Sequence, residues 1–166
     1  MANRKLAYAA DQQLTITLAS LATSATLVAG RESTAVSNAS NPYLDRTLSG
    51  KITTGTSPTA GTIQVWVVPA TNDTPTWPDV FDGTDSAETV TSADILAAAG
   101  ALAAVIATDA TSDRTYPFYC GSVAALFGGV LPRDFVVFVT HNTAVNLNST
   151  GGNHEVTSMG VYETVA

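Results

Sequence analysis

Charge is scarce in this chain. Only 13% of its 166 residues are charged, about half the usual share of about 25% in soluble domains. Its seven basic residues are scattered, and 14 acidic residues give a net charge of −7. Nucleic-acid binding needs clustered Lys and Arg to neutralise phosphates, so this composition argues against nucleic acid as a partner. The acidic balance serves solubility or meets a basic protein surface.

Cysteine and long apolar runs are also lacking. Cys120 is the only cysteine, so no intrachain disulfide can form, and its apolar surroundings in the sequence predict burial rather than reactivity. No apolar core follows the basic pair Arg4-Lys5, so we expect no signal peptide. No stretch approaches the roughly 20 apolar residues of a membrane span. We therefore expect synthesis in a cytoplasm, a soluble chain and no membrane partner.

Catalytic motifs are missing too. The chain has no Gly-x-Ser-x-Gly elbow of a serine hydrolase, and Gly128-Gly129 lacks the strand and lysine context of a phosphate loop. Nothing singles out a pair among the acidic residues for glycoside hydrolysis. The sequence predicts a protein that is not an enzyme, with no catalytic residue, cofactor or resident metal.

Short alternating segments are what the chain does have. Leu14, Ile16 and Leu18 alternate with threonines, which is typical of a half-buried strand. Ser92 is a suitable N-cap for a short helix ending at Gly100, and residues 122–127 can form one helical turn. The strands that we expect are residues 14–18, 43–53, 62–68, 102–108, 115–120, 131–142 and 154–165.

This pattern predicts an all-β fold: a single-domain antiparallel β-sandwich, jelly-roll-like, with long loops and one or two very short helices. The sandwich is expected to span residues 13–166. Residues 1–12 lack periodicity and form an N-terminal arm, either a frayed end or an anchor on a neighbouring subunit. Residues 31–42 are expected to be a long loop, and residues 69–92 form the longest irregular segment.

The best local constellation of polar residues is an acidic loop. Asp79, Asp82, Asp85 and Glu88 recur at every third position. This spacing differs from the alternate ligands of an EF-hand, although oxygen ligands on a flexible loop suit an irregular calcium site. The two interpretations are a solvated acidic loop, which we prefer, and a calcium site.

Two further pairs of residues invite a functional interpretation. His141 and His154 flank the terminal turn, but two histidines make at most half a zinc site, and ordinary roles at strand ends are preferred. Trp66 and Trp77 suit a sugar-stacking platform. Trp66 lies in an apolar strand and is expected in the core, whereas Trp77 lies in the long loop and is the better candidate for contact with a sugar or another subunit.

Several segments together resemble a family of small virion proteins of tailed bacteriophages. The resemblance begins near residue 14, and its most specific part pairs Phe127-Gly-Gly-Val-Leu-Pro132 with Thr150-Gly-Gly-Asn-His154. It contains no catalytic motif, so it implies a fold and a setting rather than a reactive site. The segments that carry it are residues 31–36, 43–45, 62–67, 77–85, 127–132 and 148–154.

Such proteins resemble capsid decoration or cement proteins. The resemblance implies a homo-oligomer on the outer surface of the virion, with the major capsid protein as partner. A receptor- or carbohydrate-binding module of a tail or head fibre is the alternative. The residues that we expect at the interface are Arg4, Lys5, Arg31, Glu32, Tyr43 and Trp77.

Overall fold

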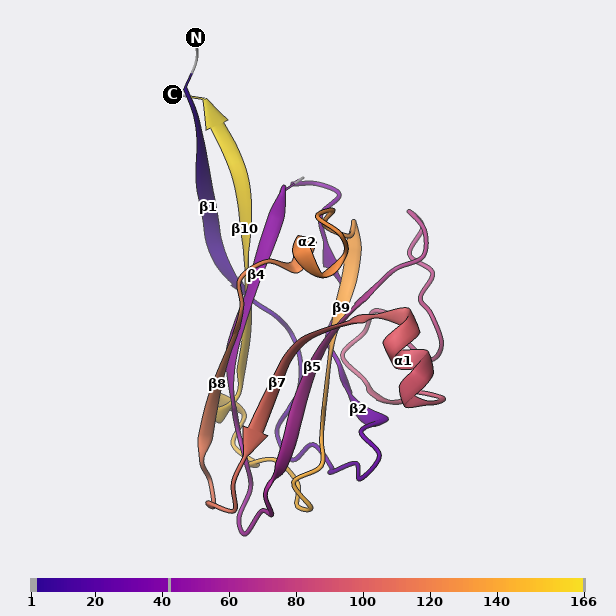
Figure 1. Ribbon diagram of the computed structural model, residues 1–166, viewed down its shortest axis with the longest axis vertical. Coiled ribbons are helices and arrows are strands. Elements are labelled where there is room, and N and C mark those ends of the chain that lie inside the picture. The colour runs from indigo at the N-terminus through magenta and orange to yellow at the C-terminus, as the bar shows by residue number, and fades with distance from the viewer. Residues whose placement is uncertain (1–2, 42, 166) are drawn as a thin grey trace.

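Two antiparallel sheets face each other in the computed structural model, which describes residues 3–41 and 43–165 (Figure 1). The first sheet has the strand order β1-β10-β4-β8, and the second has the order β6-β2-β9-β5-β7, with β3 also paired to β9. The all-β sandwich is confirmed, while its jelly-roll connectivity stays a prediction. The strands of the first sheet are β1 (Arg4–Gln13), β4 (Asp45–Thr53), β8 (Thr115–Cys120) and β10 (Glu155–Val165).

The second sheet completes the sandwich, and helices make up little of the chain. Its strands are β2 (Ala29–Glu32), β3 (Val36–Ser37), β5 (Gly61–Pro69), β6 (Ala87–Thr89), β7 (Ala101–Thr108) and β9 (Asp134–His141). The helices are α1 (Ala93–Ala99), α2 (Val123–Leu126) and the 3-10 turn η1 (Gly151–Asn153). Ser92 caps α1 as expected, because its Oγ accepts a hydrogen bond from Ile95 N at 3.1 Å.

Strand β9 is buried along its whole length, as the apolar run before the terminal turn predicts. Its Phe135, Val137 and Val139 belong to the main core cluster, which Leu48 and Ile52 of β4 join. Its other face carries Val136 and Phe138 in a second cluster with Phe81 and Leu96, so α1 and the long loop pack there. The edge of the Phe138 ring meets Phe81, with the ring centroids 5.3 Å apart.

The predicted strand at residues 14–18 is wrong. Its alternation does bury Leu14 and Leu18, but the segment joins neither sheet as a strand. Its backbone crosses between the sheets: Leu14 N donates to Val156 O at 2.8 Å, and Thr15 O accepts from Thr34 N at 2.9 Å. Alternation reports which side of a segment is buried, and an extended crossover satisfies it as well as a strand does.

The predicted loop at residues 31–42 is also partly wrong. Arg31 and Glu32 end β2, and Val36–Ser37 form β3, both paired with the central strand β9. Pro42 lies outside the described residues. Within residues 69–92, β6 adds a three-residue edge strand beside β2. These strands are short and polar, so only the neighbouring ladder identifies them.

Candidate functional site

The terminal strands leave the sandwich together as a two-stranded ribbon. Strand β4 pairs with β10 only as far as Val161, and beyond that point β10 pairs with β1 alone, from Tyr8 opposite Val161 to Arg4 opposite Val165. Figure 1 shows β1 and β10 rising clear of the other strands, with both chain ends at the tip. We call residues 4–8 and 161–165 the terminal ribbon. It contains half of the described part of the predicted arm, and Met1 and Ala2 lie outside the described residues.

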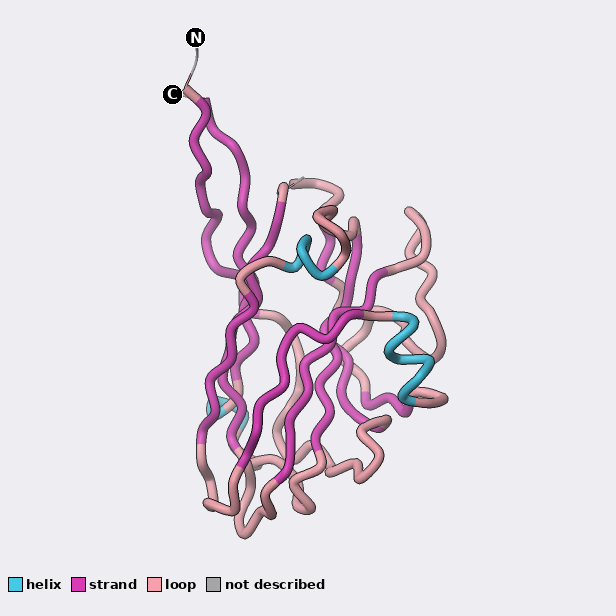
Figure 2. The backbone as a smooth tube through the Cα atoms, viewed as in Figure 1, coloured by secondary structure: helices cyan, strands magenta, loops and turns pink. Residues whose placement is uncertain are grey.

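A bulge marks the base of the ribbon. The register shifts between Tyr8 and Asp11, so two residues of β1 stand opposite Gly160 of β10. A Cβ on Gly160 would lie 2.5 Å from the ring of Tyr43, so this position requires glycine. Bulges bend and twist a strand pair, which explains why the two strands leave the sheet here (Figure 2).

One face of the terminal ribbon carries exposed apolar side chains around an ion pair. Residues opposite one another in an antiparallel pair share a face, so the register places Leu6, Tyr8, Val161 and Val165 on the same side as the Arg4–Glu163 pair. Leu6, Tyr8 and Val165 have exposed fractions of 65%, 62% and 71%. Side chains of this kind, gathered on an element with no core of its own, are typical of an interaction surface.

The ribbon also carries two of the predicted interface residues. Arg4 Nη1 forms an exposed ion pair with Glu163 Oε2 at 3.0 Å. Lys5 is exposed and, within the described chain, has no carboxylate within ion-pair distance. Tyr43 lies at the base, with its ring centroid 6.1 Å from that of Tyr162. The structure therefore brings Arg4, Lys5 and Tyr43 to one end of the molecule.

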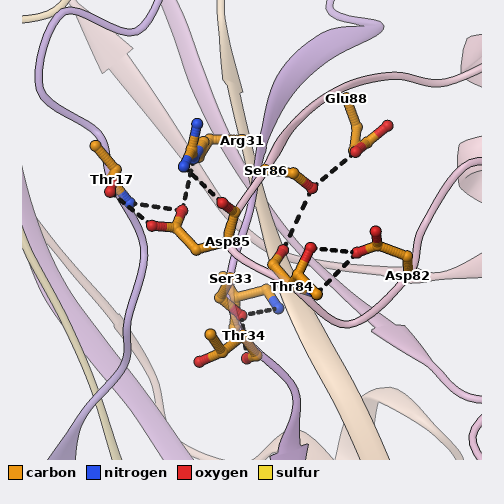
Figure 3. A network of polar contacts seen from close by, with 10 residues as sticks. Thr17, Arg31, Ser33, Thr34, Asp82, Thr84, Asp85, Ser86 and Glu88 are labelled. Atoms are coloured by element: carbon orange, nitrogen blue, oxygen red, sulfur yellow. Dashed lines mark hydrogen bonds and ion pairs between the residues drawn. The ribbon is translucent and has the colours of Figure 1, made fainter.

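The other three predicted interface residues surround the acidic loop. Arg31 is held there by Asp85: Nε donates to Oδ1 at 2.6 Å, and Nη2 donates to the Asp85 carbonyl oxygen at 2.6 Å (Figure 3). Thr17 adds two hydrogen bonds to the same carboxylate, from its backbone N at 2.9 Å and its Oγ1 at 2.6 Å. Burial alone would raise the pKa of Asp85, but these hydrogen bonds outweigh burial and lower it.

Glu32 is not a surface residue, which corrects its assignment as an interface residue. Its side chain is fully buried, and Oε1 accepts a hydrogen bond from Gly83 N at 2.6 Å and another from Asp82 N at 3.2 Å. Burial raises the pKa of Glu32 to about 7. The Glu32 side chain therefore holds the acidic loop from inside the fold. Arg31, the residue before it, points outward instead and binds Asp85.

The remaining carboxylates of the acidic loop each have a separate local partner. Asp79 accepts hydrogen bonds from Thr91 N and Oγ1 at 2.8 and 2.7 Å. Asp82 accepts from Thr84 N and Oγ1, and Glu88 accepts from Ser86 Oγ at 2.7 Å (Figure 3). Across residues 3–41 and 43–165, no three His, Cys, Asp or Glu side chains gather as a metal site would need. The loop's carboxylates order the loop itself.

Both histidines are buried and bonded to the backbone. His141 Nε2 lies 3.0 Å from Leu21 O, and His154 Nε2 lies 2.8 Å from Asn148 O. Burial lowers the pKa of each ring, so both are neutral at pH 7. They hold the crossover segment and the terminal turn in place, as expected of strand-end residues.

Both tryptophans are half-buried and pack against the second core cluster, and each has its own local contacts. Trp66 is half-buried against the second core cluster, and its Nε1 donates to Gln64 Oε1 at 3.0 Å. Trp77 is half-buried beside Gly83, where an added Cβ would lie 2.9 Å from the indole Nε1. Gly83 has a φ of +82°, so both its backbone and the neighbouring ring favour glycine there. Trp77 helps to hold the acidic loop.

Sequence reasoning missed two features of this end of the molecule. It placed no interaction surface on the last strand, although Val161 and Val165 complete the apolar face of the ribbon. It also missed Arg46, a buried guanidinium 4.8 Å from the centroid of the Tyr43 ring. Burial lowers the pKa of Arg46, which donates to Ser158 Oγ and Ser37 O, both at 3.4 Å. The signal available in the sequence for the ribbon was an alternation of side chains that continues past the end of the sheet.

Comparison with protein-family models, with curated proteins and with solved structures finds no match to this chain. Within the described ranges, no helix is long and apolar enough to cross a membrane.

Proposed function

We propose that this chain is a non-enzymatic structural protein of a tailed-phage virion, a capsid decoration or cement protein. In this role it binds the outer surface of the shell formed by the major capsid protein and adds contacts between capsomers. The observation that carries the proposal is the terminal ribbon, whose Leu6, Tyr8 and Val165 side chains are more than half exposed.

The rest of the molecule supports an assembly role. The residues that suggested chemistry are occupied with holding the fold: Asp85 pairs with Arg31, Glu32 binds backbone amides, and His141 bonds to Leu21. A cement protein gains its binding energy from many copies of a modest contact, through apolar burial and main-chain hydrogen bonds. The ribbon offers both, because it has an apolar face and a free strand edge.

The copy number in purified virions tests this function. Quantitative mass spectrometry should find hundreds of copies of the chain for each particle, as a shell protein requires. A count in single digits would place the protein on the tail and contradict the proposal. A matched pair of phages, one carrying Leu6→Ser with Tyr8→Ser and one carrying Val130→Ser, then separates the ribbon from exposed apolar residues elsewhere. We expect loss of the protein from particles only in the first.

A glycan-binding module of a tail or head fibre is the second candidate. A hollow of about 320 Å³ at the base of the ribbon favours it, because Tyr43, Tyr162 and Asn41 line it. Aromatic faces beside an amide are the groups that sugar-binding sites use. Calorimetric titration with host surface glycans tests this function: binding that Tyr162→Ala abolishes would support it, and no heat of binding would contradict it.

A further inference from the structure

The terminal ribbon differs in charge from the rest of the chain. It carries Arg4, Lys5 and Glu163, a net charge of +1, so the remaining residues carry −8. Arg4 is already paired with Glu163, whereas Lys5 has no carboxylate partner within the described chain. The ribbon is therefore a cationic element on an acidic protein, and a second copy of the chain offers it opposite charge.

The body includes a groove beside a free strand edge. The groove has a volume of about 270 Å³ and lies between residues 17–22 and strands β2 and β6. Its lining is mostly small, with Ala19, Ala22, Ala29, Gly30 and Ala87. Two charged residues join it: Arg31, which is already paired with Asp85, and Glu88. Strand β6 pairs only with β2 in the described chain, so its outer edge has unpaired backbone groups.

Strand β1 provides the matching edge. It pairs with β10 on one side and with no described strand on the other. When one strand lies beside another, alternate residues share a face. A register that sets Lys5 opposite Glu88 therefore places Leu6 beside Ala87 or Thr89, which also line the groove. One alignment thus satisfies both the charge of Lys5 and the apolar face.

We propose that the terminal ribbon of one copy adds to the β6 edge of a second copy and fills this groove. This inference rests on the proposed assembly function and names the contact between neighbouring copies. The contact joins two different surfaces, so each copy donates a ribbon and accepts one, and a rotation that closes gives a ring. The ribbon has ten residues, fewer than the roughly 20 to 30 on each side of a standard interface, so ring closure is needed for stable association.

A charge-exchange experiment tests this contact. Light scattering after size exclusion should show a closed oligomer for the wild-type chain at low salt and dissociation at high salt. Lys5→Glu and Glu88→Lys should each weaken association at least tenfold, and the double variant should recover it. Lys51→Glu and Asp73→Lys are the controls, because both residues lie away from the groove and carry the same charge changes, with Asp73 exposed and Lys51 partly exposed.

Three results would overturn the contact: a wild-type chain that stays monomeric at millimolar concentration, single reversals that leave the oligomer intact, or a double variant without recovery. Urea unfolding of each variant separates loss of association from loss of folding. This result is independent of the copy number in virions. A monomeric chain present in hundreds of copies would contradict this contact alone, and an oligomeric chain missing from particles would contradict only the proposed function.

Discussion

The sandwich body and the terminal ribbon follow opposite rules. In the body, the buried Glu32 accepts hydrogen bonds from the amides of Gly83 and Asp82, and the buried His154 is bonded to Asn148. In the ribbon, apolar groups stay outside, with Leu6 and Tyr8 more than half exposed. The body is complete as a fold, whereas the ribbon lacks a core. The difference is what the proposed assembly role rests on, because the apolar side chains of the ribbon are left at the surface.

The ribbon has little to stabilise it from within. An isolated pair of strands is marginal in water, and its exposed Arg4–Glu163 ion pair contributes at most about 1 kcal/mol. Its attachment depends on the bulge and on the Tyr43 ring over Gly160. A partner that covers the apolar face would supply the missing burial. Four variants probe this contrast, two in the body, one at the junction and one in the ribbon.

Truncation of the body core should have the largest effect. Phe138→Ala removes a fully buried ring that packs against Phe81. Loss of a buried phenylalanine costs about 3–5 kcal/mol, from lost burial and from the cavity left behind. Urea unfolding at neutral pH measures this loss. A cost below about 1 kcal/mol would contradict the assignment of the second cluster as core.

Glu32→Gln should change how stability depends on pH. Folding raises the pKa of Glu32 from 4.5 to about 7, so the folded state holds a proton that the unfolded state has lost. Its contribution is full below pH 4.5 and is lost as the pH rises to 7, a change on the order of 3 kcal/mol. The variant lacks this contribution. Its free energy of unfolding should therefore increase relative to that of the wild type as the pH rises from 4.5 to 7.

The histidines act in the opposite direction and remain in the variant. Folding lowers the pKa of His141 and His154, so their contribution is full above pH 6.5 and is lost as the pH falls below it. Urea midpoints at pH 5 and pH 8 should therefore rise more steeply with pH for Glu32→Gln than for the wild type. Parallel curves would show that Glu32 titrates normally.

Substitution at the junction should have an intermediate effect. Gly160→Ala places a Cβ 2.5 Å from the Tyr43 ring, and forced overpacking costs about 1–3 kcal/mol. Gly152→Ala is the control, because nothing lies within 4 Å of its added Cβ. Urea unfolding should separate the two variants. Equal stability would mean that Tyr43 does not pack on Gly160.

Substitution in the ribbon should have the smallest effect on folding. Leu6→Ser with Tyr8→Ser changes side chains that are already exposed, so the free energy of unfolding of the dilute chain should change by less than about 0.5 kcal/mol for each. The same urea titration measures it. A loss as large as that of Phe138→Ala would make the ribbon part of the body and erase the contrast.

The sequence predicted the body better than the ribbon. Residues 62–68, apolar on both faces, correspond to β5 inside its sheet, and residues 115–120, with Pro117, correspond to the edge strand β8. The same signal misled at residues 14–18, where an extended crossover buries alternate residues without pairing. Local pattern also could not show that Glu32 is buried, since its position depends on amides fifty residues away.

The candidate site was only half predictable, for the same reason. Arg4 and Lys5 were expected as contact residues because they stand at a basic, aperiodic start. Their strand partner, residues 161–165, comes from the other end of the chain. An apolar face made by strands so distant in sequence emerges only when the register is known.

Hydrogen–deuterium exchange tests the central claim most directly, with the dilute monomeric chain compared with the chain in purified particles. The ribbon account predicts fast exchange at residues 4–8 and 161–165 in the free chain and strong protection after assembly. The amides of β9 should be protected in both. Equal exchange of the ribbon in both states, with new protection only elsewhere on the body, would contradict it.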